Sequence, residues 1–315
     1  MPADYLHDHS QFADLIRIIA AEKGIDPVLV EKDYWIMHGL FGLQQLGLVF
    51  QLKGGTSLSK GHKAIDRFSE DIDILIEPPR GMDVKTGRNQ DKPAHIESRR
   101  RFYDWLADEK IRIDGITKVE RDAAFDDEKL RSAGIRLHYP TCVPALQGLR
   151  TGVLLEAGFD TVAPNQPRDI SSWLYDHAAG TVPIIDNRAS GVPCYDPRYT
   201  FVEKLQTIST KYRKQQETGE SPVEFMRHYY DVYCLLDRPD VQAFIGTEPY
   251  MAHKAKRFRQ GDNQVIAENA AFLLSHRETR KLYEHAFTDS TALYYGKKPT
   301  FQQVIERIAD WIDRL

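Results

Sequence analysis

Two aspartates, Asp71 and Asp73, stand two residues apart in the run EDIDILI. Ile72, Ile74 and Ile76 fill the alternate positions, which is the period-2 pattern of a half-buried strand. Side chains two apart on a strand share a face, so the two carboxylates should point the same way. Two like charges held together are costly unless a cation neutralises them. We therefore expect a hard divalent ion, Mg²⁺ or Mn²⁺, at this pair.

A glycine turn with two hydroxyl residues, Gly54, Gly55, Thr56 and Ser57, precedes this strand. Glycine lets backbone N–H groups approach an anion, and the start of a helix adds a favourable dipole. A metal site and an anion site together suit a nucleoside triphosphate held for in-line phosphoryl chemistry. Asp-x-Asp alone is more often a solvated strand face, so the upstream turn is what favours this interpretation. The P-loop pattern of ATPases, Gly-x-x-x-x-Gly-Lys-Ser/Thr, is absent.

The elements that must position these residues change in character along the chain. A mixed α/β front half, residues 1–196, is expected to end near Pro197, and residues 197–315 are expected to form a helical domain. The expected strands are 48–52, one that starts at Asp71 and ends at Pro78-Pro79, 135–139 and 153–157, and residues 160–196 should hold short structured pieces at most. The expected helices are one capped by Ser10, one capped by Asp26, and those over 56–64, 94–110, 199–215, 223–236, 264–275 and 301–315. The fold class is therefore α/β (α+β), with a mixed sheet flanked by helices.

Composition places few limits on function. The net charge is −4, so nucleic-acid binding would need a local basic patch. The three cysteines are widely spaced, which is typical of a reducing compartment. The N-terminus lacks the basic start and apolar run of a signal peptide, and no apolar stretch approaches the roughly 20 residues needed to span a bilayer. We expect a soluble, cytoplasmic protein without a membrane partner.

The segments KGGTSLSKG and RFSEDIDI resemble the AbiEii/AbiGii-type family of toxin nucleotidyltransferases. This family includes the mycobacterial MenT toxins, belongs to the polymerase-β-like superfamily and forms type IV toxin–antitoxin systems. The upstream phrase VEKDYW is similar to one common in the same family, and the resemblance is strong over residues 27–76 and thinner beyond. The family's first motif usually reads Gly-Ser, whereas here it is Gly55-Thr56-Ser57. Either hydroxyl could face the phosphates, and we favour Ser57.

Two later segments resemble further motifs of the family. FVEKL resembles the motif whose lysine contacts triphosphate, which implies that role for Lys204. RHYYDVY resembles the final motif, whose aspartate is needed for activity, which implies that role for Asp231. A lysine is a compact positive charge for phosphate oxygens, and the aspartate could fix that lysine or act as a base. The helical domain is thus expected to contribute Lys204 and Asp231 to the site.

The resemblance implies a polymerase-β-like core and an Mg-dependent reaction. A nucleoside monophosphate would pass from an NTP to an RNA acceptor, with the tRNA 3′ end expected, and block growth or translation. A cognate antitoxin is also implied. Three alternatives stay open: a nucleotidyltransferase acting on a small molecule or protein, a kinase-type phosphotransferase toxin, and a binding module without activity. Which NTP is used is not indicated by the sequence.

Several other charged residues could support this chemistry. Glu156, within an apolar strand, could be a third metal carboxylate or an outward-facing residue. Lys53, Lys60 and His62 could touch phosphate, although an exposed position is favoured for each. Lys211 lies two helical turns beyond Lys204 and could extend a phosphate or RNA track.

Two basic runs are the candidates for an RNA-facing surface, Arg99–Arg101 and the cluster at 254–259. An ordinary solvated surface is the alternative for each run, because a run of charges is most often just that.

Overall fold

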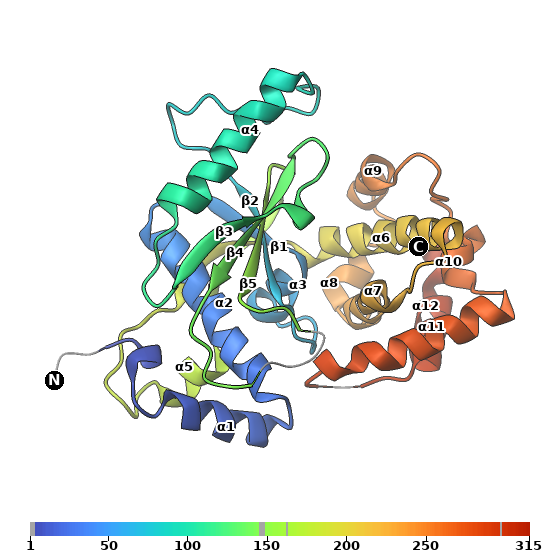
Figure 1. Ribbon diagram of the computed structural model, residues 1–315. Helices are drawn as coiled ribbons and strands as arrows, with labels where there is room; N and C mark the ends of the chain where they lie inside the picture. The colour runs from blue at the N-terminus through green and yellow to red at the C-terminus, as the bar shows by residue number, and fades with distance from the viewer. Residues whose placement is uncertain (1–3, 145–148, 162, 297) are drawn as a thin grey trace. The chain divides into compact units, whose positions relative to one another are not determined.

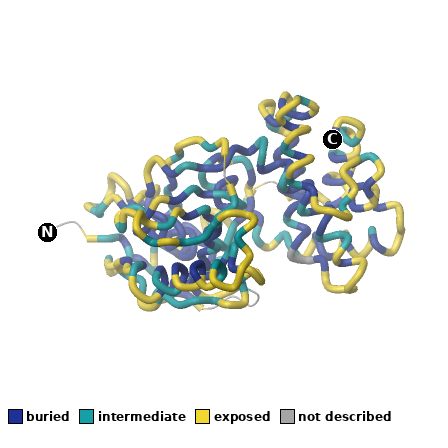
Figure 2. The backbone as a smooth tube through the Cα atoms, turned by 90° about the horizontal axis from the view of Figure 1, so that it is seen from above, coloured by how far each residue is buried: buried dark blue, intermediate teal, exposed yellow. Residues whose placement is uncertain are grey.

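The computed structural model describes residues 4–144, 149–161, 163–296 and 298–315 (Figure 1). The chain forms two compact units. The sheet unit comprises Met1–His62 and Phe68–Tyr195, and the helical unit comprises Lys63–Arg67 and Asp196–Leu315. The short segment Lys63–Arg67 therefore belongs to the helical unit, although most of the sheet follows it in sequence. In each unit, buried stretches fill the interior and exposed stretches follow the outer loops (Figure 2).

The sheet unit contains a mixed, 7-stranded sheet in the order β3-β4-β5-β2-β1-β7-β6. The strands are β1 Phe50–Lys53, β2 Asp71–Ile76, β3 Lys118–Asp122, β4 Ser132–His138, β5 Val153–Gly158, β6 Asn165–Ile170 and β7 Ala189–Tyr195. The strand β2 pairs antiparallel with β1 and parallel with β5, and β1 pairs parallel with β7. The strand that carries the aspartate pair is thus the middle strand of the sheet.

Five α-helices of the sheet unit are α1 Phe12–Lys23, α2 Pro27–Gln45, α3 Gly54–Thr56, α4 Pro93–Trp105 and α5 Trp173–Ala178. The helix α2 packs on the sheet through Gly39, where an added Cβ would stand 3.4 Å from Cδ1 of Ile72 and 3.5 Å from Cδ1 of Leu137. Ile72, Ile74 and Ile76 are buried. Since alternate side chains of a strand face opposite ways, Asp71 and Asp73 lie on the face of β2 away from α2.

The first two helices differ in how their N-termini are capped. Asp26 caps α2 as expected: its Oδ1 accepts a hydrogen bond from the Val28 N–H at 2.9 Å, with Pro27 in the first turn. The expectation for Ser10 is wrong, because α1 begins after Gln11, which makes no side-chain cap hydrogen bond. Ser10 instead lies in a turn closed by a bond from the Phe12 N–H to the carbonyl of His9.

The helical unit is built from α6 Pro197–Thr218, α7 Val223–Leu235, α8 Pro239–Phe244, α9 Glu248–Arg257, α10 Ala270–Leu273, α11 Arg277–Ser290 and α12 Phe301–Trp311. The helix α7 packs against α6, α11 and α12. Its Tyr229 and Tyr230 are fully buried, and Tyr230 stacks on Tyr294 with ring centroids 4.1 Å apart. The predicted combination of a mixed α/β part followed by a helical part is confirmed.

Some elements differ from the sequence prediction. Residues 160–196 contain β6, α5 and β7, which is more regular structure than expected. The strand β7 includes Gly191 and Pro193, which hide its pattern, yet it pairs with both β1 and β6. The edge strand β3 was missed because it is mostly charged, and the polar helices α8, α9 and α11 were missed as well. The helix expected over 264–275 is only the short α10 and one preceding 3-10 turn. Among the described residues, no helix is both long and apolar enough to span a bilayer.

Candidate active site

Three carboxylates and one lysine share a face of the sheet. On β2, Asp71 and Asp73 are half-buried and alternate with the buried isoleucines, as predicted. On β5, Glu156 is in register with Asp73, and on β1, Lys53 is in register with the same aspartate. Directly opposed residues on neighbouring strands show their side chains on one face, about 5 Å apart. Lys53, Asp73 and Glu156 therefore form a row across three strands, with Asp71 beside it.

The glycine turn lies against Asp73 of this row. Gly54 has φ +69°, a left-handed conformation that favours glycine. A Cβ added to Gly54 would also stand 2.8 Å from Cγ of Asp73, closer than such atoms can approach. Any larger residue at 54 would therefore strain the turn and displace the carboxylate. The backbone turn predicted to bind phosphate and the aspartate predicted to bind metal are thus in direct contact.

The helix after the turn is irregular. The short α3 passes directly into a π-helix, Ser57–Gly61, and Lys53 at the start of α3 makes no side-chain cap hydrogen bond. π-Helical turns are rare and recur at functional sites. Gly55 is buried, so the turn is a packed feature of the sheet unit.

Both hydroxyls of the motif already have acceptors. The Thr56 hydroxyl donates to the carbonyl of Asp71 at 2.5 Å, which ties the turn to the start of β2. The fully buried Ser57 donates to the carbonyl of Tyr195 at 3.4 Å. A serine hydroxyl has one proton, so Ser57 would have to release Tyr195 in order to donate to a phosphate. The preference for Ser57 over Thr56 stays a prediction.

The three carboxylates of this face suit a hard divalent cation. Asp71, Asp73 and Glu156 supply oxygen donors, which are the ligands of Mg²⁺ and Mn²⁺. In the part of the chain that the structure describes, no group of three or more His, Cys, Asp or Glu side chains is already drawn together as a metal site. Mg²⁺ is commonly held by one or two protein carboxylates together with substrate phosphates, so Asp71 and Asp73 would suffice.

Three consecutive charged residues of α2, Glu31, Lys32 and Asp33, are each only 1% exposed. Buried charges need specific partners, and each of these has one. Glu31 accepts hydrogen bonds from the Cys142 N–H and the Thr141 hydroxyl, both at 2.6 Å. Through the segment VEKDYW, α2 is therefore bonded to segments of the sheet unit that are distant in sequence.

Lys32 is the member of this trio that bears on the candidate site. Its Nζ donates to the carbonyl of Arg150 at 2.8 Å and lies 3.5 Å from Oε2 of Glu70. Burial lowers the pKa of Lys32, and the negative charges of Glu70 and Asp71 partly oppose that shift. A fixed cation thus stands beside the end of β2 where Asp71 lies. Apart from the resemblance of the segment VEKDYW, nothing in the sequence indicates this role for Lys32.

Two residues expected at the exposed surface are internal. Lys60 pairs with buried Asp33 at 2.5 Å and lies 4.9 Å from the centre of the Trp173 ring. His62 bonds through Nε2 to the carbonyl of Tyr195 at 3.0 Å. The exposed interpretation is therefore wrong for both, and their side chains hold the π-helix and its exit in place.

In the helical unit, Lys204 and Asp231 are brought together with Arg67. Lys204 Nζ lies 2.9 Å from Oδ2 of Asp231, and Arg67 grips the same carboxylate through Nε at 2.6 Å and Nη2 at 2.8 Å. Asp231 and Arg67 are buried, and Lys204 is 8% exposed. Burial alone would raise the pKa of Asp231, but the two cations lower it below its usual value. Sequence reasoning missed Arg67 because nothing local links it to residue 231.

This arrangement separates the two roles considered for Asp231. A carboxylate fixed by two cations and shifted toward its charged form is a weak proton acceptor. Burial lowers the pKa of Lys204, while Asp231 opposes that shift and keeps the ammonium positioned. The contact that the positioning role requires, between Asp231 and Lys204, is present. Whether Lys204 acts on triphosphate stays a prediction.

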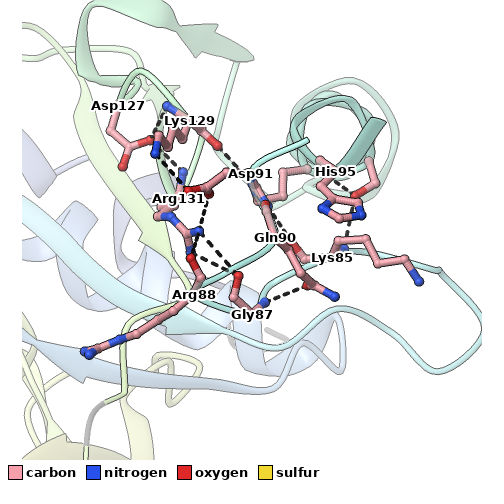
Figure 3. Close-up of polar contacts among 11 residues, drawn as sticks. Lys85, Gly87, Arg88, Gln90, Asp91, His95, Asp127, Lys129 and Arg131 are labelled. Carbon is pink, nitrogen blue, oxygen red and sulfur yellow. Dashed lines mark hydrogen bonds and ion pairs between the residues drawn. The ribbon is translucent and has the colours of Figure 1, made fainter. Parts of the chain in front are cut away.

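The first basic run is not an intact RNA-facing surface. Arg99 is fully buried and donates to the carbonyls of Lys129 at 2.9 Å and Lys85 at 2.5 Å. These carbonyls lie in a loop network that Figure 3 shows, in which Asp91 accepts from Lys129 at 2.8 Å and from Arg131 at 2.5 Å. Arg99 thus fixes the loop before α4, and only Arg100 and Arg101 of the run are exposed.

The second basic run is divided in the same way. Lys254 is buried and donates to the carbonyl of Leu315, and Arg257 pairs with Glu203 at 3.3 Å. Lys256 and Arg259 remain exposed. Neither run can act as a continuous basic patch, because tertiary contacts use part of each.

Comparison with known proteins identifies the family of the chain. No curated protein matches the sequence. A structural comparison finds an antigenic nucleotidyltransferase-like protein from Paracoccidioides brasiliensis, with a TM-score of 0.38, 12% identity, and coverage of 84% of this chain and 98% of that chain. The profile of the family described as nucleotidyl transferase AbiEii toxin, type IV TA system, matches residues 35–307, which include every candidate site residue named above except Glu31, Lys32 and Asp33. The chain therefore belongs to the AbiEii family of nucleotidyl transferase toxins.

Proposed function

We propose that this toxin transfers a nucleoside monophosphate from an NTP to a hydroxyl of an RNA acceptor, at the 3′ end of tRNA. Family membership implies nucleotidyl transfer, a nucleotide substrate and an antitoxin partner. The observation that carries the proposal is the contact between Asp73 and the Gly54 turn, with Asp71 and Glu156 on the same face. A cation site and a phosphate site must adjoin in any enzyme that holds a metal-bound triphosphate.

In the proposed reaction, the acceptor oxygen forms a bond to the α-phosphorus while the bond to the β-phosphate oxygen breaks. Pyrophosphate leaves with that electron pair, and the acceptor proton passes to a carboxylate of the row or to water. Asp71 and Asp73 would hold Mg²⁺, which when bound neutralises charge on the phosphate oxygens. The backbone N–H groups of Gly54 and Gly55 would orient the triphosphate.

Four residues take supporting roles in this proposal. Lys204 would neutralise charge on the triphosphate, and Asp231 would position Lys204 without acting as the base, since Arg67 and Lys204 hold it in its charged form. Glu156, in register with Asp73, is the carboxylate we assign to a third metal-ligand or proton-acceptor role. Lys32 would balance the charge of Asp71 before a cation binds.

Transfer is tested by incubating the full chain with each α-³²P NTP and total tRNA in the presence of Mg²⁺. The proposal predicts label in RNA from one or few of the four nucleotides, and none from the γ-³²P form. Incorporation of label from the γ-³²P form alone would indicate a kinase-type reaction and contradict nucleotidyl transfer. Label in a small molecule or protein, with none in RNA, would remove RNA as the acceptor while leaving nucleotidyl transfer.

A further inference from the structure

A cavity of about 590 Å³ lies in the helical unit, outside the site described above. It is lined by the C-terminal half of α6, by the connection from α6 to α7, by the start of α7 and by the segment after α9. The lining residues that bear on its chemistry are Gln206, Lys211, Lys214, Glu220, Phe225 and Arg259. Its volume is in the range of small-molecule pockets, which is large enough for a nucleotide.

The charge of this cavity is positive. Lys211, Lys214 and Arg259 line it against a single lining carboxylate, Glu220. Lys214 and Arg259 are exposed. Among the described residues, no carboxylate pairs with either of them. Two exposed cations aimed at one hollow form a site where phosphate groups would displace counterions.

A nearby carboxylate is already neutralised. Asp262 is fully buried at its side chain and accepts from Nε of Arg213 at 3.1 Å and from the hydroxyl of Thr210, which lines the cavity. Further along, His228 is buried beside Lys204 and Lys211, and burial followed by those positive charges lowers its pKa well below the usual value. Asp262 is therefore paired within the protein and is not a partner of Lys214 or Arg259.

The cavity also offers groups that suit a base. Phe225, which is 5% exposed, lines its wall, and the Tyr283 ring meets it edge-on with ring centroids 5.3 Å apart. Gln206 and Gln215 contribute side-chain amides. Cations for phosphates combined with an aromatic ring for stacking are the standard components of single-stranded nucleic-acid sites. A purely acidic protein segment would use the cations but not the ring.

We propose that this cavity binds a phosphate-bearing nucleotide of the single-stranded end of the RNA acceptor. The inference deepens the proposed transfer to RNA and rests on it for the choice of ligand. It also moves the expected RNA-facing surface from the two basic runs to this cavity, which keeps only Arg259 of the second run. Arg99 and Lys254 are internal, whereas Lys214 and Arg259 are exposed.

The test is binding of a fluorescein-labelled single-stranded 12-nucleotide RNA to the full chain, followed by fluorescence anisotropy over a range of NaCl concentrations without NTP or Mg²⁺. The cavity variant is Lys211→Ala/Lys214→Ala/Arg259→Ala. Its matched control is Lys256→Ala/Arg277→Ala/Lys281→Ala, which removes three exposed charges of the same helical unit. Each triple variant changes the net charge from −4 to −7. Lys214→Ala/Arg259→Ala, which changes exposed residues only, serves if the triple variant fails to fold.

Losing three phosphate contacts should make the slope of log K against log[NaCl] shallower by about 2, since each contact on a single strand contributes roughly 0.7. Affinity near 100 mM NaCl should fall about tenfold or more. The control variant should keep the wild-type slope. Unchanged affinity and slope in the cavity variant, or an equal loss in the control, would overturn the inference.

Two competitors distinguish other sources of the same charges. Unlabelled RNA should displace the probe, whereas poly-glutamate of equal charge and free ATP should do so only weakly. Displacement by poly-glutamate as effective as by RNA would indicate an acidic protein partner, and displacement by ATP would indicate an NTP site; either result contradicts the inference. Labelled NMP transfer is measured separately. Transfer to RNA by a cavity variant of unchanged affinity refutes the cavity alone, whereas cavity-dependent RNA binding without any transfer refutes the proposed function alone.

Discussion

The backbone of Gly54 lies against the carboxylate of Asp73, so closely that a Cβ on Gly54 would stand 2.8 Å from Cγ of the aspartate. This relationship joins two motifs separated by a π-helix and a segment of the other unit. The turn therefore requires glycine at position 54 for two reasons, the φ angle of +69° and the close approach to Asp73. A triphosphate held by this turn would have its phosphates beside the carboxylate that binds the metal.

Gly54→Ala tests that contact, and Gly47→Ala is its control. Gly47 has the same φ of +69° but nothing within 4 Å of an added Cβ. Both variants should lose about 1–2 kcal/mol from the left-handed backbone. Only Gly54→Ala should also displace Asp73 and lose NMP transfer, measured with the α-labelled NTP, while Gly47→Ala stays active. Equal transfer by the two folded variants would show that the close approach has no functional role.

The buried group of Arg67, Asp231 and Lys204 predicts a strong effect on stability. Asp231→Asn removes the only carboxylate of the group and leaves two buried cations, which should cost about 3–5 kcal/mol in the free energy of unfolding. Urea denaturation of the wild type and the variant measures this loss. A change below about 1 kcal/mol would be too small for a buried charge left unpaired.

Lys204 variants separate charge from shape in the same group. Lys204→Ala should lose most NMP transfer, and Lys204→Arg should recover only part of it, because the guanidinium is larger and planar. The readout is kcat and KM for the NTP at saturating RNA. Full activity of Lys204→Ala would end the assignment of Lys204 to the triphosphate.

A buried histidine of α2 predicts loss of stability in acid. His38 bonds through Nε2 to the carbonyl of Asp114 at 2.8 Å, and its Nδ1 faces the Asn187 amide at 2.9 Å. Its carbonyl partner requires the proton on Nε2, so Nδ1 accepts from Asn187 and has no place for a second proton. Burial, with His7 as a further contribution, lowers the pKa of His38 to about 4.

The direction of the change in stability with pH follows from the lowered pKa of His38. The unfolded chain binds a proton at His38 below about pH 6.5, whereas the folded chain binds it only near pH 4, so stability is lost as pH falls between them. Between pH 7.5 and pH 5 the loss should be about 2 kcal/mol. His38→Gln should unfold with a pH dependence flatter by that amount, measured by urea denaturation at both pH values. The same slope in both proteins would show that His38 does not titrate as described.

Sequence alone was sufficient where the signal is local. The alternation of Asp71 and Asp73 with isoleucines, and the Asp26 cap of α2, needed only neighbouring residues. Two other features join residues that are far apart in the chain: Glu156 is in register with Asp73, and Arg67 bonds to Asp231. The periodicity of a segment does not predict such long-range contacts. Arg99 was predicted to be at the surface for the same reason. Nothing in a run of arginines indicates that the fold buries one of them.

The most direct test of the account is NMP transfer by Asp73→Asn. The substituted amide keeps the size of the side chain beside Gly54 but loses the charge that holds Mg²⁺. Asp83→Asn, at an aspartate whose side chain is 81% exposed, is the matched control. With both variants shown to be folded by circular dichroism and urea denaturation, transfer of α-³²P from NTP to tRNA should be abolished in Asp73→Asn and unchanged in Asp83→Asn. Wild-type transfer by a folded Asp73→Asn protein would contradict the proposed metal centre.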